Sequence, residues 1–365
     1  MTQGDVVPEW PANELEAVQS CPVCRHKGRR LLHEGLTDRV FRCAPGVWSL
    51  YQCLECGAAY LDPRPTPASI WRAYTSYYTH KPSNNEPPLS TMSVRQRLRR
   101  ALRNGYVNAR YGSNLQPASI LGRWMVPALY GKQGEIDHSL RNLPRLKKGE
   151  SRKVLDIGCG NGAFLKEAMQ LGWEAHGIDP DPKAAGQVAG LRVEQGALPE
   201  TNLPGATFDV VTLSHVIEHT HDPVASLREV LRLLKPDGQV WVATPNLMSY
   251  CHQCFQADWI GLQSPSHLVL FSHSSISYAL RAAGFDGVRF SSMYPQARGY
   301  YHMSWRVAQG EFPFAAIGSP LPASVTVRAA ISDLLSALLP SRRADIVVTA
   351  MKSLKVTSTQ RPLST

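Results

Sequence analysis

The fold is decided by the stretch VLDIGCGNG at residues 154–162. Its apolar start is typical of a buried parallel strand, and its glycines free the backbone for a sharp turn into a helix. Such a turn lets a ligand lie against bare main chain at the helix N-terminus. With Ala163 the glycines also fit the dinucleotide pattern G-x-G-x-x-G/A, so their spacing alone does not identify the ligand.

Two carboxylates narrow the choice of ligand. Asp156 ends the strand two residues before the first glycine, where it would repel a pyrophosphate but suits a cation. The acidic residue after the next expected strand is Asp179, which can accept hydrogen bonds from both ribose hydroxyls. A carboxylate that favours cations, bare glycines and a ribose clamp together predict S-adenosylmethionine (SAM) as the cofactor.

On these residues the sequence resembles the class I SAM-dependent methyltransferases, from about Lys153 to Asp286. The matching segments follow in order: VLDIGCGNG, HGID at 176–179, FDVVTLSHVIEH at 208–219, LRLLKPDGQV at 231–240 and ATPN at 243–246. The resemblance implies that Asp156 and the glycines hold the methionyl end of SAM, that Asp179 holds the ribose, and that residues 196–198 hold the adenine.

The cofactor-binding residues implied by this resemblance lie at strand ends and in the turns that follow them. They are Asp156, Gly158, Cys159, Gly160, Gly162, Phe164, Asp179, Pro180, Ala197, Leu198, Ser214 and His215. One position departs from the family pattern, because many relatives carry an aspartate near Gly196 that reaches the adenine amine, and this chain has Ala197. Adenine recognition would here rest on backbone groups.

Strands and helices alternate after Lys153, which predicts an α/β fold with a doubly wound, Rossmann-like parallel sheet. The ligand crevice is expected at the carboxyl ends of its strands. A helix over residues 275–283 leads into a strand at 288–290, and residues 345–350 are expected to complete the sheet as an antiparallel partner. The amphipathic segment 327–339 is interpreted as a packed helix or dimer contact rather than a membrane anchor.

Five of the eight cysteines precede residue 60 and include two C-x-x-C pairs. Four thiolates close the shell of a tetrahedral zinc ion, so Cys21, Cys24, Cys53 and Cys56 predict a structural zinc site on a ribbon hairpin. Cys43 is interpreted as a small apolar residue rather than a ligand. The pair at 251–254 has no clear fourth ligand and is interpreted as a site without metal.

These motifs divide the chain into four expected parts. They are a zinc-ribbon module at 1–65, a helical linker and cap at 66–150, the SAM-binding methyltransferase domain at 151–354 and a disordered tail at 355–365. The ribbon, its Pro-Arg-Pro exit at 63–65 and the tyrosine-rich segment 70–78 resemble a subgroup of methyltransferases encoded with sugar and natural-product pathways. Residues 81–88 are expected to form a mobile loop.

Charge indicates an anionic partner without identifying it. The net charge is +10, and six arginines fall between residues 95 and 110. A solvated helix face and a clamp for phosphate are both consistent with these arginines. No apolar stretch approaches the ~20 residues of a membrane span, and the N-terminus has no apolar signal core, so we expect a cytoplasmic protein.

Methyl transfer from a sulfonium is an in-line displacement, so orientation supplies most of the acceleration. A hydroxyl acceptor also needs a base near neutral pH. The candidate catalytic residues are His267, His219 and Glu218, while His215 is assigned to the cofactor. Each histidine has an alternative as a hydrogen-bonded packing residue.

The acceptor is predicted to be a small molecule, and the basic charge of the chain is consistent with phosphate groups on that molecule. Enzymes that methylate nucleic-acid bases commonly carry an Asn/Asp-Pro-Pro-aromatic tetrad where this chain has SHVI at 214–217. We expect O-methylation of a nucleotide-linked sugar or a natural-product intermediate. An RNA methyltransferase stays open, because ribosomal RNA guanine methyltransferases also carry an N-terminal zinc module. A non-catalytic scaffold subunit and a homodimer stay open as well.

Overall fold

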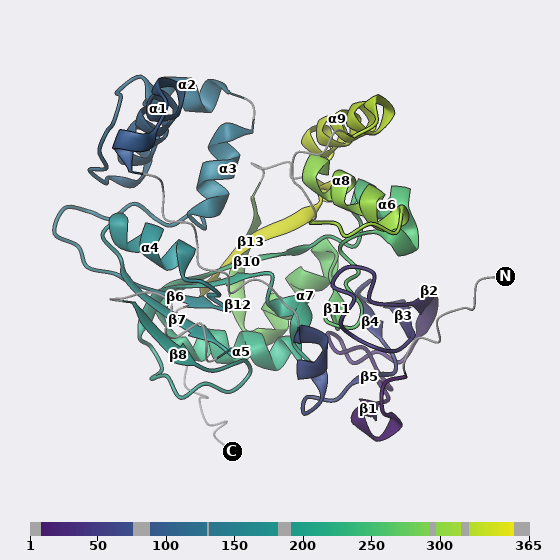
Figure 1. Ribbon diagram of the computed structural model, residues 1–365. Coiled ribbons are helices and arrows are strands. Elements are labelled where there is room, and N and C mark those ends of the chain that lie inside the picture. The colour runs from purple at the N-terminus through teal and green to yellow at the C-terminus, as the bar shows by residue number, and fades with distance from the viewer. Residues whose placement is uncertain are drawn as a thin grey trace, which may run out of the picture.

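The strand and glycine turn at 154–162 lie in the middle of a seven-stranded sheet (Figure 1). The computed structural model describes residues 9–75, 88–129, 131–181, 191–291, 297–314 and 321–353. The strands follow the order β12-β13-β10-β9-β6-β7-β8 across the sheet. Their bounds are β6 (Lys153–Ile157), β7 (Glu174–Asp179), β8 (Arg192–Gln195), β9 (Phe208–Ser214), β10 (Leu234–Pro245), β12 (Phe285–Phe290) and β13 (Asp345–Lys352).

The pairing of these strands confirms the predicted doubly wound sheet. β6 runs parallel to β7 and β9, and β10 runs parallel to β9. β13 runs antiparallel to β10 and β12, as the sequence predicts for residues 345–350. The carboxyl ends of the parallel strands therefore meet at one edge, which is where such folds bind their ligands.

Consecutive residues of the central strands supply two separate cores on opposite faces of the sheet. Val154 and Val210 pack with residues of α1 (Val94–Tyr111) and α4 (Ala163–Gln170). Leu155 and Val211 pack with residues of α5 (Pro223–Leu233) and α7 (His273–Ala283). Because both faces are buried, these strands read as continuous apolar runs in the sequence.

One predicted boundary is shifted. The apolar spacing up to Leu234 predicts a helix that includes this residue, and Pro236 and Gly238 predict a stop before a strand that starts at Gln239. In the structure α5 ends at Leu233, and Leu234 already pairs with Phe208. The register shifts between Leu234 and Gln239, where Asp237 has a positive φ of 61°. The segment KPDG thus forms a bulge within β10 rather than a loop before it.

The N-terminal module is a ribbon whose sheet includes part of the methyltransferase region. β2 (Arg29–Leu36) and β3 (Trp48–Cys53) form the predicted antiparallel hairpin, and β4 (Ala59–Leu61) pairs with β3. The fourth strand is β11 (Val269–Leu270), which pairs with β4. The short strands β1 (Leu15–Glu16) and β5 (Arg64–Pro65) pair separately. The ribbon and the methyltransferase region are therefore joined by main-chain hydrogen bonds.

The segment 91–145 is mostly helical, as predicted, with α1, α2 (Gly122–Ala128) and α3 (Lys132–Ser139). On another side of the sheet stand α6 (Tyr250–Phe255), α8 (Ala297–Ala308) and α9 (Ala323–Leu338) (Figure 1). The segment predicted as a packed amphipathic helix is α9, and it buries small residues such as Ala329 and Ser332. Its contacts with α8 confirm the packed face.

Some expectations fall outside the described residues. These are most of the loop at 81–88, the tyrosines at 77–78 and the tail at 355–365. Among the helices that the structure describes, none is long and apolar enough to cross a membrane.

Candidate active site

The glycine turn has the backbone conformation that requires glycine. Gly158, Gly160 and Gly162 have φ values of 68°, 52° and 71°, which side chains other than glycine rarely adopt. A Cβ on Gly158 would also lie 2.6 Å from Val216 Cγ2. The Gly160 amide donates to Asp179 Oδ2 at 2.8 Å. The turn and the proposed ribose clamp are therefore adjacent, although 19 residues separate them in the sequence.

Asp156 is buried at the end of β6. Its Oδ1 accepts a hydrogen bond from Thr212 Oγ1 at 2.6 Å. Burial raises the pKa of Asp156, and the charge of Arg141 and the Thr212 hydroxyl oppose that rise. The Arg141 guanidinium lies over the rings of Phe164 and Trp241, 5.1 Å from each centroid. Its buried Nε has no hydrogen-bond partner among the described residues.

The other residues assigned to the cofactor lie around these two carboxylates. The Gly196 amide donates to the Asp179 carbonyl at 3.1 Å, which places residues 196–198 beside the proposed ribose site. Pro180 is exposed after β7, whereas Cys159 and Phe164 are buried. Ser214 ends β9, and the amide of His215 donates to the Ala243 carbonyl at 2.8 Å. The twelve residues thus gather at the carboxyl ends of β6, β7 and β9 and just after β8.

Glu218 is the centre of a buried polar cluster after β9. Its side chain is fully buried, and Oε2 accepts a hydrogen bond from Thr244 Oγ1 at 3.0 Å. Its Oε1 lies 3.3 Å from His215 Nδ1. His215 Nε2 lies 3.9 Å from Asp345 Oδ2, and Tyr300 donates to Asp345 Oδ1 at 2.6 Å. Residues from both ends of the methyltransferase region therefore meet at this point.

The pKa values of the cluster favour an ion pair between Glu218 and His215. Burial opposes ionisation of Glu218, but His215, His219 and His267 together lower its pKa to about 2. Burial also opposes the protonated form of His215, and Asp345 and Glu218 outweigh it and raise the pKa of His215 to about 8. His215 is therefore mostly protonated near neutral pH, which makes it a weaker proton acceptor than a neutral imidazole.

His219 and His267 form a neutral pair beside this cluster. His219 Nδ1 lies 2.8 Å from the Ser266 carbonyl and 2.9 Å from the Tyr74 hydroxyl. His267 Nδ1 lies 2.8 Å from the Gly261 carbonyl, and the two imidazole centroids are 4.7 Å apart. Since a carbonyl only accepts, each Nδ1 carries the proton and each Nε2 has a free lone pair.

The two histidines differ in how deeply they are buried. Burial lowers the pKa of both, for His267 to about 3 with the help of His219. His267 is only 2% exposed, whereas His219 is partly exposed. His219 is therefore the more accessible of the two.

Two groups of described residues have the spacing to hold a metal ion. One is Cys21, Cys24, Cys53 and Cys56, whose sulfur atoms all lie within 4.8 Å of one another. The Sγ atoms of Cys21 and Cys56 are 3.6 Å apart, and those of Cys24 and Cys53 are 3.5 Å apart. Zn–S bonds of ~2.3 Å in a tetrahedron give sulfur separations of about 3.8 Å, so this set fits zinc. The other group is Glu218, His219 and His267.

The remaining cysteines lie apart from the four. The Cys43 thiol lies 3.5 Å from the Ala73 carbonyl and is not part of the group of four. Cys251 is buried on α6 against Ser304, and Cys254 is exposed on the same helix.

Four functional candidates are absent from the sequence-based set: Tyr74, Arg141, Tyr300 and Asp345. Tyr74 belongs to the aromatic segment noted after the ribbon, but nothing in its spacing indicates a contact with His219. The sequence position of Asp345 could have indicated a place in the site, because the first residue of an antiparallel strand lies at the edge where the parallel strands end. It faces Pro245, the last residue of β10.

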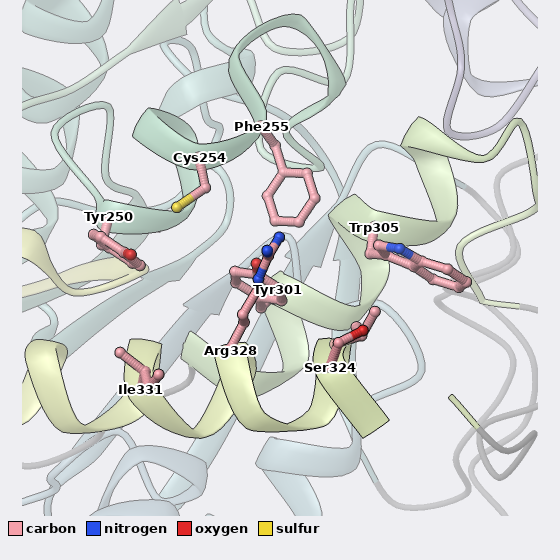
Figure 2. A pocket seen from close by; sticks show the side chains of 9 residues that line it. Tyr250, Cys254, Phe255, Tyr301, Trp305, Ser324, Arg328 and Ile331 are labelled. Atoms are coloured by element: carbon pink, nitrogen blue, oxygen red, sulfur yellow. The ribbon is translucent and has the colours of Figure 1, made fainter. Parts of the chain in front are cut away.

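A cavity of about 450 Å³ lies between α6, α8 and α9 (Figure 2). Figure 2 shows aromatic side chains around it, with the Arg328 side chain reaching up from α9. No residue predicted for the site lines it. Tyr301 of α8 faces this cavity, whereas its neighbour Tyr300 faces Asp345, so α8 separates the cavity from the buried cluster.

Comparison with known proteins agrees with this geometry. Residues 132–289 match a family model described as a methyltransferase domain. The chain is 30% identical over 158 residues to a ubiquinone biosynthesis O-methyltransferase of Burkholderia thailandensis, covering 39% of this chain and 68% of that protein. The Bordetella avium enzyme of the same name is 29% identical over 154 residues, covering 38% of this chain and 63% of that protein. The chain belongs to the class I SAM-dependent methyltransferases.

A solved structure of a SAM-dependent methyltransferase from Archaeoglobus fulgidus is also similar, at 23% identity and a TM-score of 0.39. The match covers 55% of this chain and 86% of that one. The chain spans about two thirds or less of the length of the first curated relatives.

Proposed function

We propose that this chain transfers the methyl group of SAM to a hydroxyl oxygen of a small-molecule acceptor. The acceptor we propose is a nucleotide-linked sugar or a natural-product intermediate. Curated relatives named as O-methyltransferases support the class of reaction. The observation that carries the proposal is His219, whose Nδ1 is held by a carbonyl and a hydroxyl so that Nε2 is free to accept a proton.

The residues at the glycine turn fit SAM. The three glycines with positive φ leave bare main chain at the start of α4, and Asp179 stands beside them. The methionyl end of SAM carries an ammonium and a carboxylate. Asp156 would attract the ammonium, and the unpartnered Nε–H of Arg141 would donate to the carboxylate. Asp179 would accept from the ribose hydroxyls.

SAM supplies an electrophilic methyl group and a good leaving group. The work left to the protein is to orient the acceptor and to remove its proton. His219 Nε2 would take the hydroxyl proton as the oxygen attacks. The Ser266 carbonyl and Tyr74 hydroxyl would then hold the imidazolium in place. The nearby Glu218 carboxylate would stabilise the positive charge that develops on His219.

The ribbon would have a structural role in this enzyme, with one zinc ion closed in by four thiolates. Tyr74 follows the ribbon directly, and His267 precedes β11, which pairs with β4 of the ribbon. The Leu61 amide donates to the Leu268 carbonyl at 3.1 Å, and the Leu268 amide donates to the Glu218 carbonyl at 2.8 Å. The ribbon would thereby fix the loop on which His267 and Ser266 lie.

The proposed reaction is tested by incubating the enzyme with SAM bearing a deuterated methyl group and pools of small molecules. Mass spectrometry should find the label on an oxygen of a small acceptor. Label found only in RNA would contradict the proposal and favour an RNA methyltransferase. Tight SAM binding without transfer to any acceptor would favour a scaffold subunit.

Replacing Asp179 by alanine is expected to weaken SAM binding by ~1–3 kcal/mol, because a two-point contact to the ribose and the Gly160 hydrogen bond are lost. Isothermal titration calorimetry measures the change directly. Asp286→Ala is a matched control, since Asp286 is exposed on β12 away from the turn. Unchanged SAM affinity in Asp179→Ala would contradict the assignment.

A further inference from the structure

The hairpin of α1 and α2 exposes large apolar side chains that the rest of the described chain does not cover. On and beside α2, five such residues fall within ten positions and are exposed: Ile120, Leu121, Trp124, Met125 and Leu129. Trp124 is 67% exposed and Ile120 is 75% exposed. On α1, Val94 is 83% exposed, and residues 94–99 are all exposed. Single exposed apolar residues are normal, whereas a cluster on one face indicates an interaction site.

This apolar face is held rigidly. α1 packs closely on the segment that leads into α2, because a Cβ on Gly105 would lie 1.8 Å from the Ser119 carbonyl oxygen. A Cβ on Gly122 would lie 2.0 Å from the Leu102 carbonyl oxygen. The buried side of α2 is Gly122 and Val126. Because this side of α2 packs against α1, the side that carries Trp124 faces away from α1 and is exposed.

The same hairpin contains most of the net charge of the chain. Residues 94–128 include seven arginines and no lysine or acidic residue, which gives +7 against a total of +10. Arg103 pairs with Glu167 on α4 at 2.5 Å. Arg95, Arg97 and Arg99 are exposed, as is Arg123, whose guanidinium lies over the Trp124 ring at 4.6 Å.

We infer that the α1–α2 hairpin docks the enzyme on an anionic lipid bilayer. Helices that lie at a membrane surface combine an apolar face with tryptophan and a basic polar face, and they need no membrane-spanning segment. Arginines near the surface attract anionic headgroups while the apolar side chains enter the boundary of the acyl chains. A phosphate-binding surface for RNA would use the arginines but leaves the aliphatic cluster unexplained.

A second apolar stripe lies at the same edge of the molecule. Val327, Ile331, Leu334 and Leu338 are exposed on α9 at helical spacing. Figure 1 shows α9 and the α1–α2 hairpin both at the upper edge as drawn, with β13 below them. The inference does not depend on which acceptor the enzyme methylates.

The test is cosedimentation of the full chain with vesicles of phosphatidylcholine, with and without phosphatidylglycerol, at about 0.1 M and at higher salt. Wild type should bind the anionic vesicles, and the binding should weaken as salt rises. Ile120→Ser with Trp124→Ser should weaken it at least about tenfold, as should Arg97→Gln with Arg99→Gln. Val47→Ser with Met169→Ser is the matched control, because both side chains are comparably exposed on other parts of the chain. Thermal melts should stay unchanged in all three variants.

Failure of wild type to bind anionic vesicles would overturn the inference. So would equal binding by the Ile120/Trp124 variant. Analytical ultracentrifugation without vesicles tests whether a second copy of the chain occupies this face. A dimer that dissociates in the Ile120/Trp124 variant would show that the face is an interface between copies. Preferential binding of an RNA oligonucleotide, lost only in the arginine variant, would assign the face to nucleic acid. SAM affinity is expected to stay the same throughout, which separates this result from a failure of the proposed function.

Discussion

Replacing His219 by alanine is expected to lower kcat by ~10²–10⁴-fold while SAM still binds. The range is typical of a positioned general base, and the structure provides the geometry for one. Nδ1 is held by the Ser266 carbonyl and the Tyr74 hydroxyl, and Nε2 is free on a partly exposed ring. The measurement is steady-state kinetics with the identified acceptor, together with calorimetry for SAM. His302→Ala is the control, because His302 lies on α8 outside the cluster.

The pH profile gives a second readout. Burial lowers the pKa of His219 below its usual range near 6.5. Only the neutral imidazole accepts a proton, so activity should hold as pH falls toward that range and decline only when pH passes below the lowered pKa. The His219→Ala variant should lose this limb. Tyr74→Phe, which removes one contact to Nδ1, should lower kcat less than His219→Ala and keep the limb.

Two outcomes would contradict the base. If His219→Ala and His267→Ala both keep wild-type kcat and pH dependence, orientation alone carries catalysis, and an amine or an already ionised acceptor becomes the better assignment. If activity depends on added Mg²⁺ or Mn²⁺, the triad of Glu218, His219 and His267 would act on a metal ion instead. The proton-transfer role predicts full activity without added divalent cations.

The parts of this site that the sequence predicts are those with a local signal, such as a strand end, a glycine turn or a C-x-x-C pair. The glycine turn, Asp156 and Asp179 follow from strand ends and glycine positions, because local backbone chemistry demands them. The four cysteines follow from paired spacing, since zinc requires four thiolates in a small volume. The partition of apolar residues between two cores likewise follows from the period of two along each strand.

Contacts between distant segments could not be predicted in this way. Tyr74 and His219 are 145 residues apart, and Tyr300 and Asp345 are 45 residues apart. Neither pair has a spacing that a helix or strand would impose. The pairing of β4 with β11 is of the same kind, because two-residue β11 has no strand signal of its own. The raised pKa of His215 could not be predicted from the sequence either, since it depends on the contact with Asp345.

Replacing cysteines of the proposed zinc site is expected to disable the enzyme, although four thiolates would leave the metal no open position for catalysis. Protein purified without added zinc should contain about one equivalent of zinc, and Cys21→Ser with Cys56→Ser should lose it. Structural zinc contributes ~10–16 kcal/mol of folding free energy in small zinc modules. That is comparable to the ~5–15 kcal/mol by which a whole domain is usually stable, so the ribbon should not hold its fold without metal.

Loss of the zinc should affect the active site through the main-chain hydrogen bonds between β4 and β11. With the ribbon disordered, β11 loses its partner β4, and Ser266 and His267 lie just before β11. Tyr74 would also lose its fixed position next to His219. We expect kcat to fall far more than SAM affinity, because Asp156 and Asp179 lie on β6 and β7, away from the ribbon sheet.

Cys43→Ser provides the matched control for this prediction. It makes the same chemical change in the same module, but the Cys43 thiol contacts the Ala73 carbonyl rather than the other four sulfurs. This variant should keep its zinc, its melting temperature and its kcat. Full zinc retention in the Cys21/Cys56 variant would show that the ligands lie elsewhere. Loss of zinc with unchanged kcat would show that the ribbon does not position the loop of His267, and the ribbon would then be a separate module.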